Sequence, residues 1–177
     1  MIILCRKTTV TSQQLPDGNL LLHGQFEDEN HLIDAQVTVD RGTGLVTSAY
    51  ATMGRTPYGE VCHRPLAAAG QLVGVTIGKG SSRQVAAILG GPNGCTHLVD
   101  LVIEVFRAYV PSLARLEEFR LTDVYTGEGL PAGQVREKVF GDIRDLGRRV
   151  IPETCAAYHV EAQGKDKAKD EKKDQTA

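Results

Sequence analysis

The stretch Gly90-Gly91-Pro92-Asn93-Gly94-Cys95-Thr96-His97-Leu98 ends one predicted helix and begins another. Glycine and asparagine tolerate the positive φ angles of tight turns, so the part before Cys95 is typical of a turn. The residues after it repeat apolar side chains at the helical spacing i, i+3, i+4, i+7 and i+8, namely Leu98, Leu101, Val102, Val105 and Phe106. We therefore expect a helix that begins at Cys95, buries one face and ends before Pro111.

Cys95 is the leading candidate for chemistry. The first turn of a helix has unpaired N–H groups that favour negative charge, and such a position stabilises a thiolate. His97 follows two residues later. Cys95 is therefore a candidate nucleophile or metal ligand. The alternative is a cysteine that serves only packing, because free cysteines are among the most buried residues.

The composition is that of an ordinary globular protein. The 177 residues are 41% hydrophobic and 24% charged, with a formal net charge of −2. This charge provides no attraction for nucleic acid or for an anionic membrane surface. Aromatic residues make up 5% and there is no tryptophan, which disfavours a base-stacking surface. We expect a protein partner or a small ligand rather than a nucleic acid.

No segment approaches the ~20 consecutive apolar residues of a membrane span. The first seven residues are too short for a signal peptide. We therefore expect a cytoplasmic protein, in which cysteines are reduced thiols or metal ligands rather than disulfides. The cysteines are Cys5, Cys62, Cys95 and Cys155.

The first half of the chain predicts a β-meander of about four strands, over residues 2–13, 20–27, 33–39 and 45–53. Short turns such as Pro16-Asp17-Gly18-Asn19 separate these runs. In the third run, apolar residues alternate with Asp34, Gln36 and Thr38, so the sheet should have one face in water.

The second half predicts helices over residues 60–73, from Ser81 or Ser82 to Leu89, from Cys95 onward and from 132 to 150, with a mixed region at 112–130. Strands followed by helices indicate an α+β fold, with the helices packed on one face of the sheet. We expect a core domain over 1–125, a helical appendage over 126–160 and a disordered charged tail over 161–177.

Metal ligation is the strongest candidate for a site. Asp34, Cys62, Cys95 and His97 supply ligand types that suit zinc, but their spacing matches no standard zinc motif. Such a site would have to form from separate elements. His23 and His31 are expected at the sheet surface. Gly78-Lys79-Gly80-Ser81 resembles part of a phosphate-binding loop, but the spacing is wrong and the segment is more typical of a turn that precedes a helix.

Several motifs in this order resemble a bacterial family known as domain of unknown function 2889, over about residues 5 to 110. They are Asp17-Gly18-Asn19-Leu20, Ile33-Asp34-Ala35, Cys62, Ile77-Gly78-Lys79-Gly80 and, most specifically, Gly94-Cys95-Thr96-His97-Leu98. The family usually has His-Asp-Met where this chain has Ile33-Asp34-Ala35, so the resemblance implies that one histidine ligand is missing here.

The order of Asp34, Cys62, Gly78-Lys79 and Cys95 is also similar to that of iron–sulfur cluster scaffold proteins. The resemblance implies the scaffold fold, with Asp34, Cys62 and Cys95 converging at one end of the sheet. Leu32 and Gly94 stand where the scaffolds have a third cysteine and a histidine, and His97 or His31 would have to substitute.

We therefore expect a small accessory or carrier protein that binds zinc or an iron–sulfur cluster. Two alternatives stay open: a thiol-dependent enzyme that uses Cys95, and a non-catalytic interaction subunit whose site has degenerated.

Overall fold

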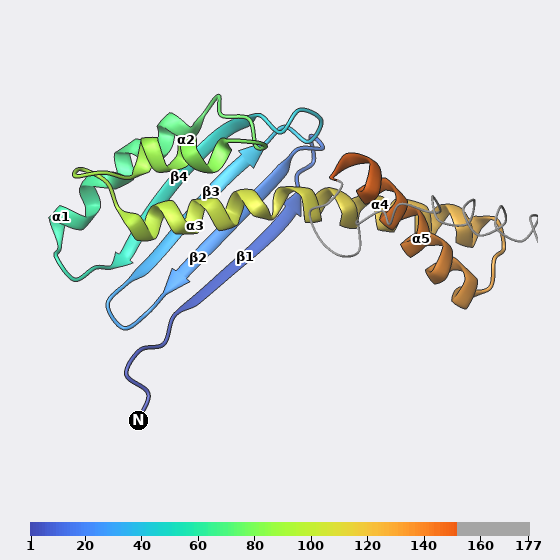
Figure 1. Cartoon of the computed structure of the whole chain (residues 1–177), viewed down its shortest axis with the longest axis horizontal. Coiled ribbons are helices and arrows are strands. Elements are labelled where there is room, and N and C mark those ends of the chain that lie inside the picture. The colour runs from blue at the N-terminus through green and yellow to red at the C-terminus, as the bar shows by residue number, and fades with distance from the viewer. Residues whose placement is uncertain (152–177) are drawn as a thin grey trace, which may run out of the picture. The chain divides into compact units, whose positions relative to one another are not determined.

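Four strands form one antiparallel sheet in the computed structural model, which describes residues 1–151 (Figure 1). Their order in the sheet follows the chain: β1 (Lys7–Gln14), β2 (Leu20–Glu27), β3 (Leu32–Val39) and β4 (Val46–Arg55). The predicted meander is confirmed, although β1 begins at Lys7 rather than near the first residue.

The two faces of the sheet differ as the alternation predicted. Ile33, Ala35 and Val37 are almost completely buried, whereas Asp34 and Gln36 between them point to the opposite face. In β2 the buried side chains are those of Leu20, Leu22 and Phe26. The sheet therefore has one face for the core and one face toward water.

Four helical segments cover the apolar face (Figure 1). They are α1 (Glu60–His63), the 3-10 helix η1 (Arg64–Leu72), α2 (Ser81–Leu89) and α3 (Thr96–Arg107). The predicted helices over 60–73, from Ser81 and from Cys95 are confirmed. Together with the sheet they form the α+β architecture that the sequence indicated.

α3 packs against β2 at the one position where the strand has no side chain. A Cβ atom built on Gly24 would lie 2.4 Å from Val105 Cγ2 and 2.9 Å from Leu101 Cδ1. Both distances are far below a normal van der Waals contact. The glycine therefore lets the helix approach the strand closely.

The prediction of a mixed region over 112–130 was wrong, because all of these residues except the last three belong to one helix, α4 (Tyr109–Gly127). Pro111 lies in its first turn, where backbone N–H groups have no partner within the helix, so the proline does not break it. The turn that follows is short, and α5 (Ala132–Val150) confirms the last predicted helix.

The chain divides into two compact units, Met1–Leu113 and the residues from Ala114 onward. The sequence predicts this boundary at residue 125. In the second unit the helical hairpin formed by residues 114–150 buries a small cluster, Leu121, Tyr125, Val135 and Val139. The Tyr125 hydroxyl also donates a hydrogen bond to the Asp142 carboxylate, which links the two helices.

The expected charged tail over 161–177 and Cys155 lie outside the described residues. Within residues 1–151, no helix is both long enough and apolar enough to cross a membrane.

Replacing Gly24 by valine should destabilise the fold by about 1–3 kcal/mol, because the new side chain would overlap Val105 and Leu101. The measurement is the free energy of unfolding in urea. Thr11→Val is the matched control, because Thr11 lies on an exposed part of β1 and is already β-branched, so valine introduces the same residue without extra bulk or a clash. Equal stability of the two variants would show that the contact between α3 and β2 is looser than described.

Candidate functional site

Asp28 organises the turn between β2 and β3. Its Oδ1 accepts hydrogen bonds from the backbone N–H groups of Asn30 (2.9 Å) and His31 (2.8 Å). Its own N–H donates to the carbonyl of His31 at 3.0 Å. The residue is only 6% exposed although it carries a charge. The turn therefore holds a carboxylate in the interior, beside the end of the sheet.

His31 is fixed by the same carboxylate. Its Nδ1 lies 2.9 Å from Asp28 Oδ1, and its side chain is 13% exposed. An ionised carboxylate only accepts hydrogen bonds, so Nδ1 carries the proton and, in a neutral ring, Nε2 keeps a free lone pair. The expectation that His31 lies on the sheet surface was wrong, because the turn folds the ring inward.

The pKa of the Asp28 carboxyl is lowered from 3.8 to about 2. Burial is the largest single influence and raises this pKa, but the hydrogen bonds from the Asn30 and His31 N–H groups and the His31 ring together outweigh it. Asp28 is therefore an anion at neutral pH.

The start of α3 brings His97 to this turn. Cys95 is the N-cap residue of α3, as predicted, and its N–H donates to the carbonyl of Leu89 at 2.8 Å. Gly94 permits this close approach, because a Cβ there would lie 2.2 Å from the Leu89 carbonyl oxygen. The junction between α2 and α3 is thereby held in place.

His97 shares one face of α3 with Leu101 and Val105, since residues four apart lie on the same side of a helix. Its ring stacks on Phe26 with 5.3 Å between centroids and lies 4.2 Å from the ring of His31. Burial, and then the charges of His31 and Arg6, lower the pKa of His97. The ring is therefore neutral at pH 7.

Arg6 covers this group of side chains. Its Nε is 3.6 Å from Asp28 Oδ2, its Nη2 is 3.4 Å from His97 Nε2, and its guanidinium carbon lies 5.7 Å from the centre of the Phe26 ring. Because a guanidinium only donates, His97 Nε2 accepts this hydrogen bond. The arginine side chain is 52% exposed, so solvent reaches the group from its side.

Asp28, His31 and His97 each place one ligand atom within 4.8 Å of the others. Among residues 1–151 this is the one group of three or more histidine, cysteine or carboxylate side chains close enough to share a metal ion. We call it the Asp28–His31–His97 group. Two imidazoles and one carboxylate form a ligand set that suits zinc or ferrous iron.

Of the four ligands predicted from the sequence, His97 alone belongs to this group. Asp34 lies on the water-facing side of the sheet, where its Oδ1 accepts hydrogen bonds from His23 Nε2 (3.0 Å) and Gln25 Nε2 (3.1 Å). α3 packs on the other face. The sheet therefore separates Asp34 from Cys95 and His97.

Cys62 lies in α1 and Cys95 at the start of α3, each partly buried as a free thiol outside the group. Ile33, where the family resemblance implies a histidine, is completely buried in the core. Position 33 thus provides no ligand in this chain.

Sequence reasoning missed Asp28 and underrated His31. The available signal was the turn Asp28-Glu29-Asn30-His31 itself, because an aspartate that begins a tight turn bonds to the backbone two or three residues later. A histidine at that third position lies within reach of the same carboxylate.

The model of the family described as "Protein of unknown function (DUF2889)" matches residues 5–110. This match covers more than half of the chain, so the chain belongs to that family. It includes every member of the Asp28–His31–His97 group and also Arg6. No curated protein and no solved structure matches the chain.

Replacing Asp28 by asparagine should destabilise the metal-free protein by about 1–3 kcal/mol at pH 7, because buried N–H groups and the His31 ring lose a charged acceptor. The pKa of Asp28 is lower in the folded protein than in the unfolded chain. Its contribution is therefore complete above about pH 4 and is lost as the pH falls toward 2.

The measurement is urea unfolding with a chelator present, at pH 7 and at pH 3. The difference between wild type and Asp28→Asn should be smaller at pH 3. Asp34→Asn is the control, since Asp34 is more exposed and accepts no hydrogen bond from the backbone of a turn. A difference that does not change with pH would contradict the lowered pKa of Asp28.

Proposed function

We propose that this protein binds a divalent transition-metal ion, zinc or ferrous iron, through Asp28, His31 and His97. The observation that carries the proposal is the convergence of these three side chains within 4.8 Å, from a turn of the sheet and from the first residues of α3. The protein would act as a metal-binding accessory or carrier protein.

The ligand set favours a single ion over an iron–sulfur cluster. Clusters are held mainly by cysteine thiolates, and the Asp28–His31–His97 group includes none. Three protein ligands leave at least one coordination position of a zinc or ferrous ion for water or a small molecule. A structural zinc site would instead use four protein ligands.

Part of the ligand set is open in the metal-free arrangement, because the shortest polar contact of Asp28 Oδ2 within residues 1–151 is its 3.6 Å ion pair with Arg6. His31 Nδ1 donates to Asp28 Oδ1, so the ring has to give up this hydrogen bond and turn before it shares an ion with the Asp28 carboxylate. Tetrahedral zinc ligands lie roughly 3.3–3.5 Å apart, and the ligand atoms of the group lie within 4.8 Å of one another, so they have to move closer by at most about 1.5 Å on binding.

Arg6 has to move away from Asp28 and His97 when an ion binds. Its positive charge lies against both Asp28 and His97, and a metal ion would occupy the same electrostatic position. The half-exposed arginine side chain is free to extend into water. Arg6 therefore weakens metal binding and occupies the group while no ion is bound.

Isothermal titration calorimetry with zinc should give about one binding site per chain. His31→Ala and His97→Ala should each lower the affinity by about tenfold or more, whereas Arg6→Gln should raise it because an opposing charge is removed. Zinc at 100 times the dissociation constant should stabilise the wild-type protein by about 2.7 kcal/mol.

His23→Ala is the matched control, because His23 also has an aspartate partner at 3.0 Å but lies on the water-facing side of the sheet. Cys62→Ser and Cys95→Ser test the ligands first predicted from the sequence. The proposal fails if zinc binding is absent, or if it depends on either cysteine and not on His31 and His97.

A further inference from the structure

The helical hairpin of residues 114–150 has two grooves of different character. One groove, of about 310 Å³, is mostly apolar and is lined by Leu130, Val135, Val139 and Phe140 together with three threonine and alanine side chains and two charged ones. The other is lined mainly by charged residues, Glu117, Asp142, Asp145 and Arg149. The charged groove is thus suited to water, and the apolar groove is suited to a partner.

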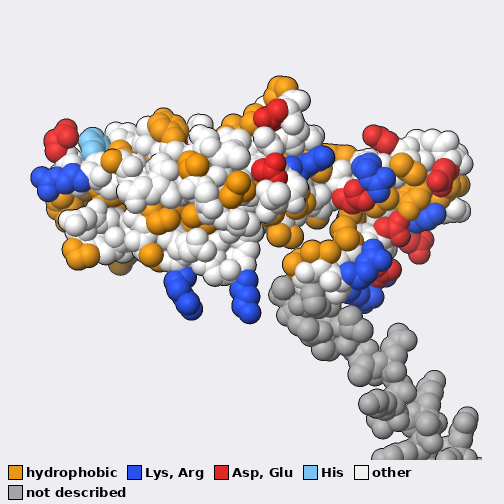
Figure 2. All heavy atoms as spheres, turned by 90° about the horizontal axis from the view of Figure 1, so that it is seen from above, with side chains coloured by type: hydrophobic (Ala, Val, Ile, Leu, Met, Phe, Trp, Pro, Cys, Tyr) orange, Lys and Arg blue, Asp and Glu red, His pale blue; other side chains and the backbone are white. Residues whose placement is uncertain are grey.

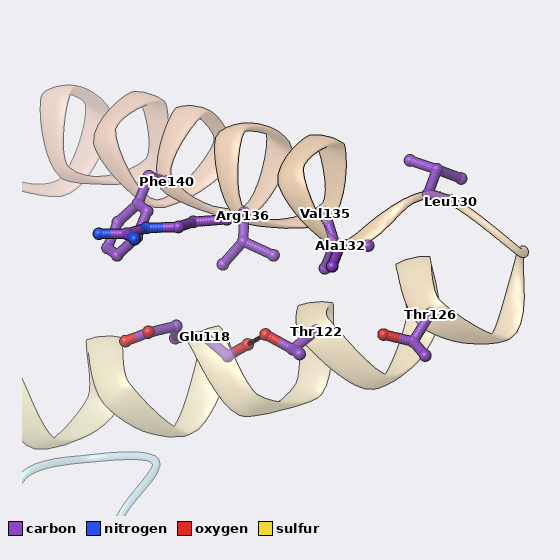
Figure 3. Close-up of a pocket in the computed structure, with 9 residues that line it drawn as sticks. Glu118, Thr122, Thr126, Leu130, Ala132, Val135, Arg136 and Phe140 are labelled. Atoms are coloured by element: carbon purple, nitrogen blue, oxygen red, sulfur yellow. Dashed lines mark hydrogen bonds between the residues drawn. The ribbon is translucent and has the colours of Figure 1, made fainter.

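Figure 3 shows the apolar groove between the two helices. Glu118, Thr122 and Thr126 lie along the α4 side, and Val135, Arg136 and Phe140 along the α5 side. Phe140 is 51% exposed, and its ring is covered in part by the Arg136 guanidinium at 5.7 Å. An apolar surface of this kind, with charged residues at its edges, is typical of an interaction site.

The buried apolar cluster of the hairpin is small within residues 114–151. Two helices of 19 residues each share the small cluster around Leu121, Tyr125, Val135 and Val139 within the described part of the unit. Helices in water are stabilised mainly by packing of their apolar faces, and a second layer normally supplies that packing. A second hairpin would convert this pair into a four-helix bundle.

The charges of the hairpin fit a second copy of itself. α4 carries three acidic and two basic residues, whereas α5 carries three acidic and five basic residues. Figure 2 shows side chains of both signs, with hydrophobic ones between them, over the helical unit. At the groove, acidic Glu118 and basic Arg136 lie on opposite helices, and Glu118 also forms an ion pair with Arg115 of its own helix. A twofold axis along the groove would bring each residue to its opposite in the other copy.

We infer that the chain forms a homodimer in which the apolar grooves of two hairpins pack together, with α4 of one copy against α5 of the other. In this arrangement Phe140 enters the interface, and Glu118 pairs with Arg136 of the second copy. The inference is independent of metal binding, because no residue of the Asp28–His31–His97 group takes part.

Analytical ultracentrifugation of the full chain at increasing concentration is the first test. Wild type should approach twice the 19.1 kDa mass of one chain. Phe140→Glu should weaken dimerisation about a hundredfold or more, because a charge would be buried in an apolar interface. Val124→Glu is the matched control and should still dimerise, since Val124 is an exposed apolar residue of α4 outside the groove. Circular dichroism checks that both variants keep their helices.

A charge reversal then identifies the pairing. Glu118→Arg and Arg136→Glu should each weaken the homodimer, and a mixture of the two variants should restore dimers, because each then meets its opposite charge in the other chain. Pairing within one chain would give no recovery on mixing. A monomeric wild type, a dimer that is unaffected by Phe140→Glu, or no recovery in the mixture would overturn the inference. A groove covered by the chain's own residues or by another protein would give a monomeric wild type.

Discussion

The close approach of α3 to β2 at Gly24 is the constraint on which the site depends. One turn of helix, about four residues, advances roughly 6 Å, and two residues of strand advance roughly 6.6 Å. The spacing of His97, Leu101 and Val105 along α3 therefore matches the spacing of the buried side chains along β2. When Leu101 and Val105 lie over Gly24, His97 arrives over Phe26, two residues further along the strand. Packing of the hydrophobic core thus places His97 beside the turn that follows β2.

Much of the fold could be predicted because its signals are local. Alternating apolar residues with turn residues between them located the four strands, and the Asn93-Gly94 turn with the periodic residues after it located α3. The helix from Cys95 ends before Pro111, as predicted from the proline. The error concerned residues 112–130, where the apolar residues show only weak helical periodicity although most of the segment belongs to α4.

The candidate site was less predictable because it joins residues far apart in the chain. His97 was identified from its place after Cys95, but its partners lie in a turn that is more than sixty residues away. Asp34 illustrates the opposite case, since the alternation that predicted a water-facing strand face already placed it there. Helices had to cover the other face to bury Ile33 and Ala35, so Asp34 and the start of α3 fall on opposite sides of the sheet. Combining strand alternation with helix placement would have separated them.

The match between helix and strand has a further consequence for how this sequence can change in length. A single-residue insertion between His97 and Leu101 would rotate His97 by about 100° around the helix and away from Phe26. The contacts of Leu101 and Val105 with Gly24 would persist, so such a chain would keep its core and lose its histidine from the group. In loops such as the one that joins α4 and α5, no side chain has to keep a fixed rotation around a helix relative to a strand. We therefore expect the Asp28–His31–His97 group to survive a change of length in such loops but not within this turn of α3.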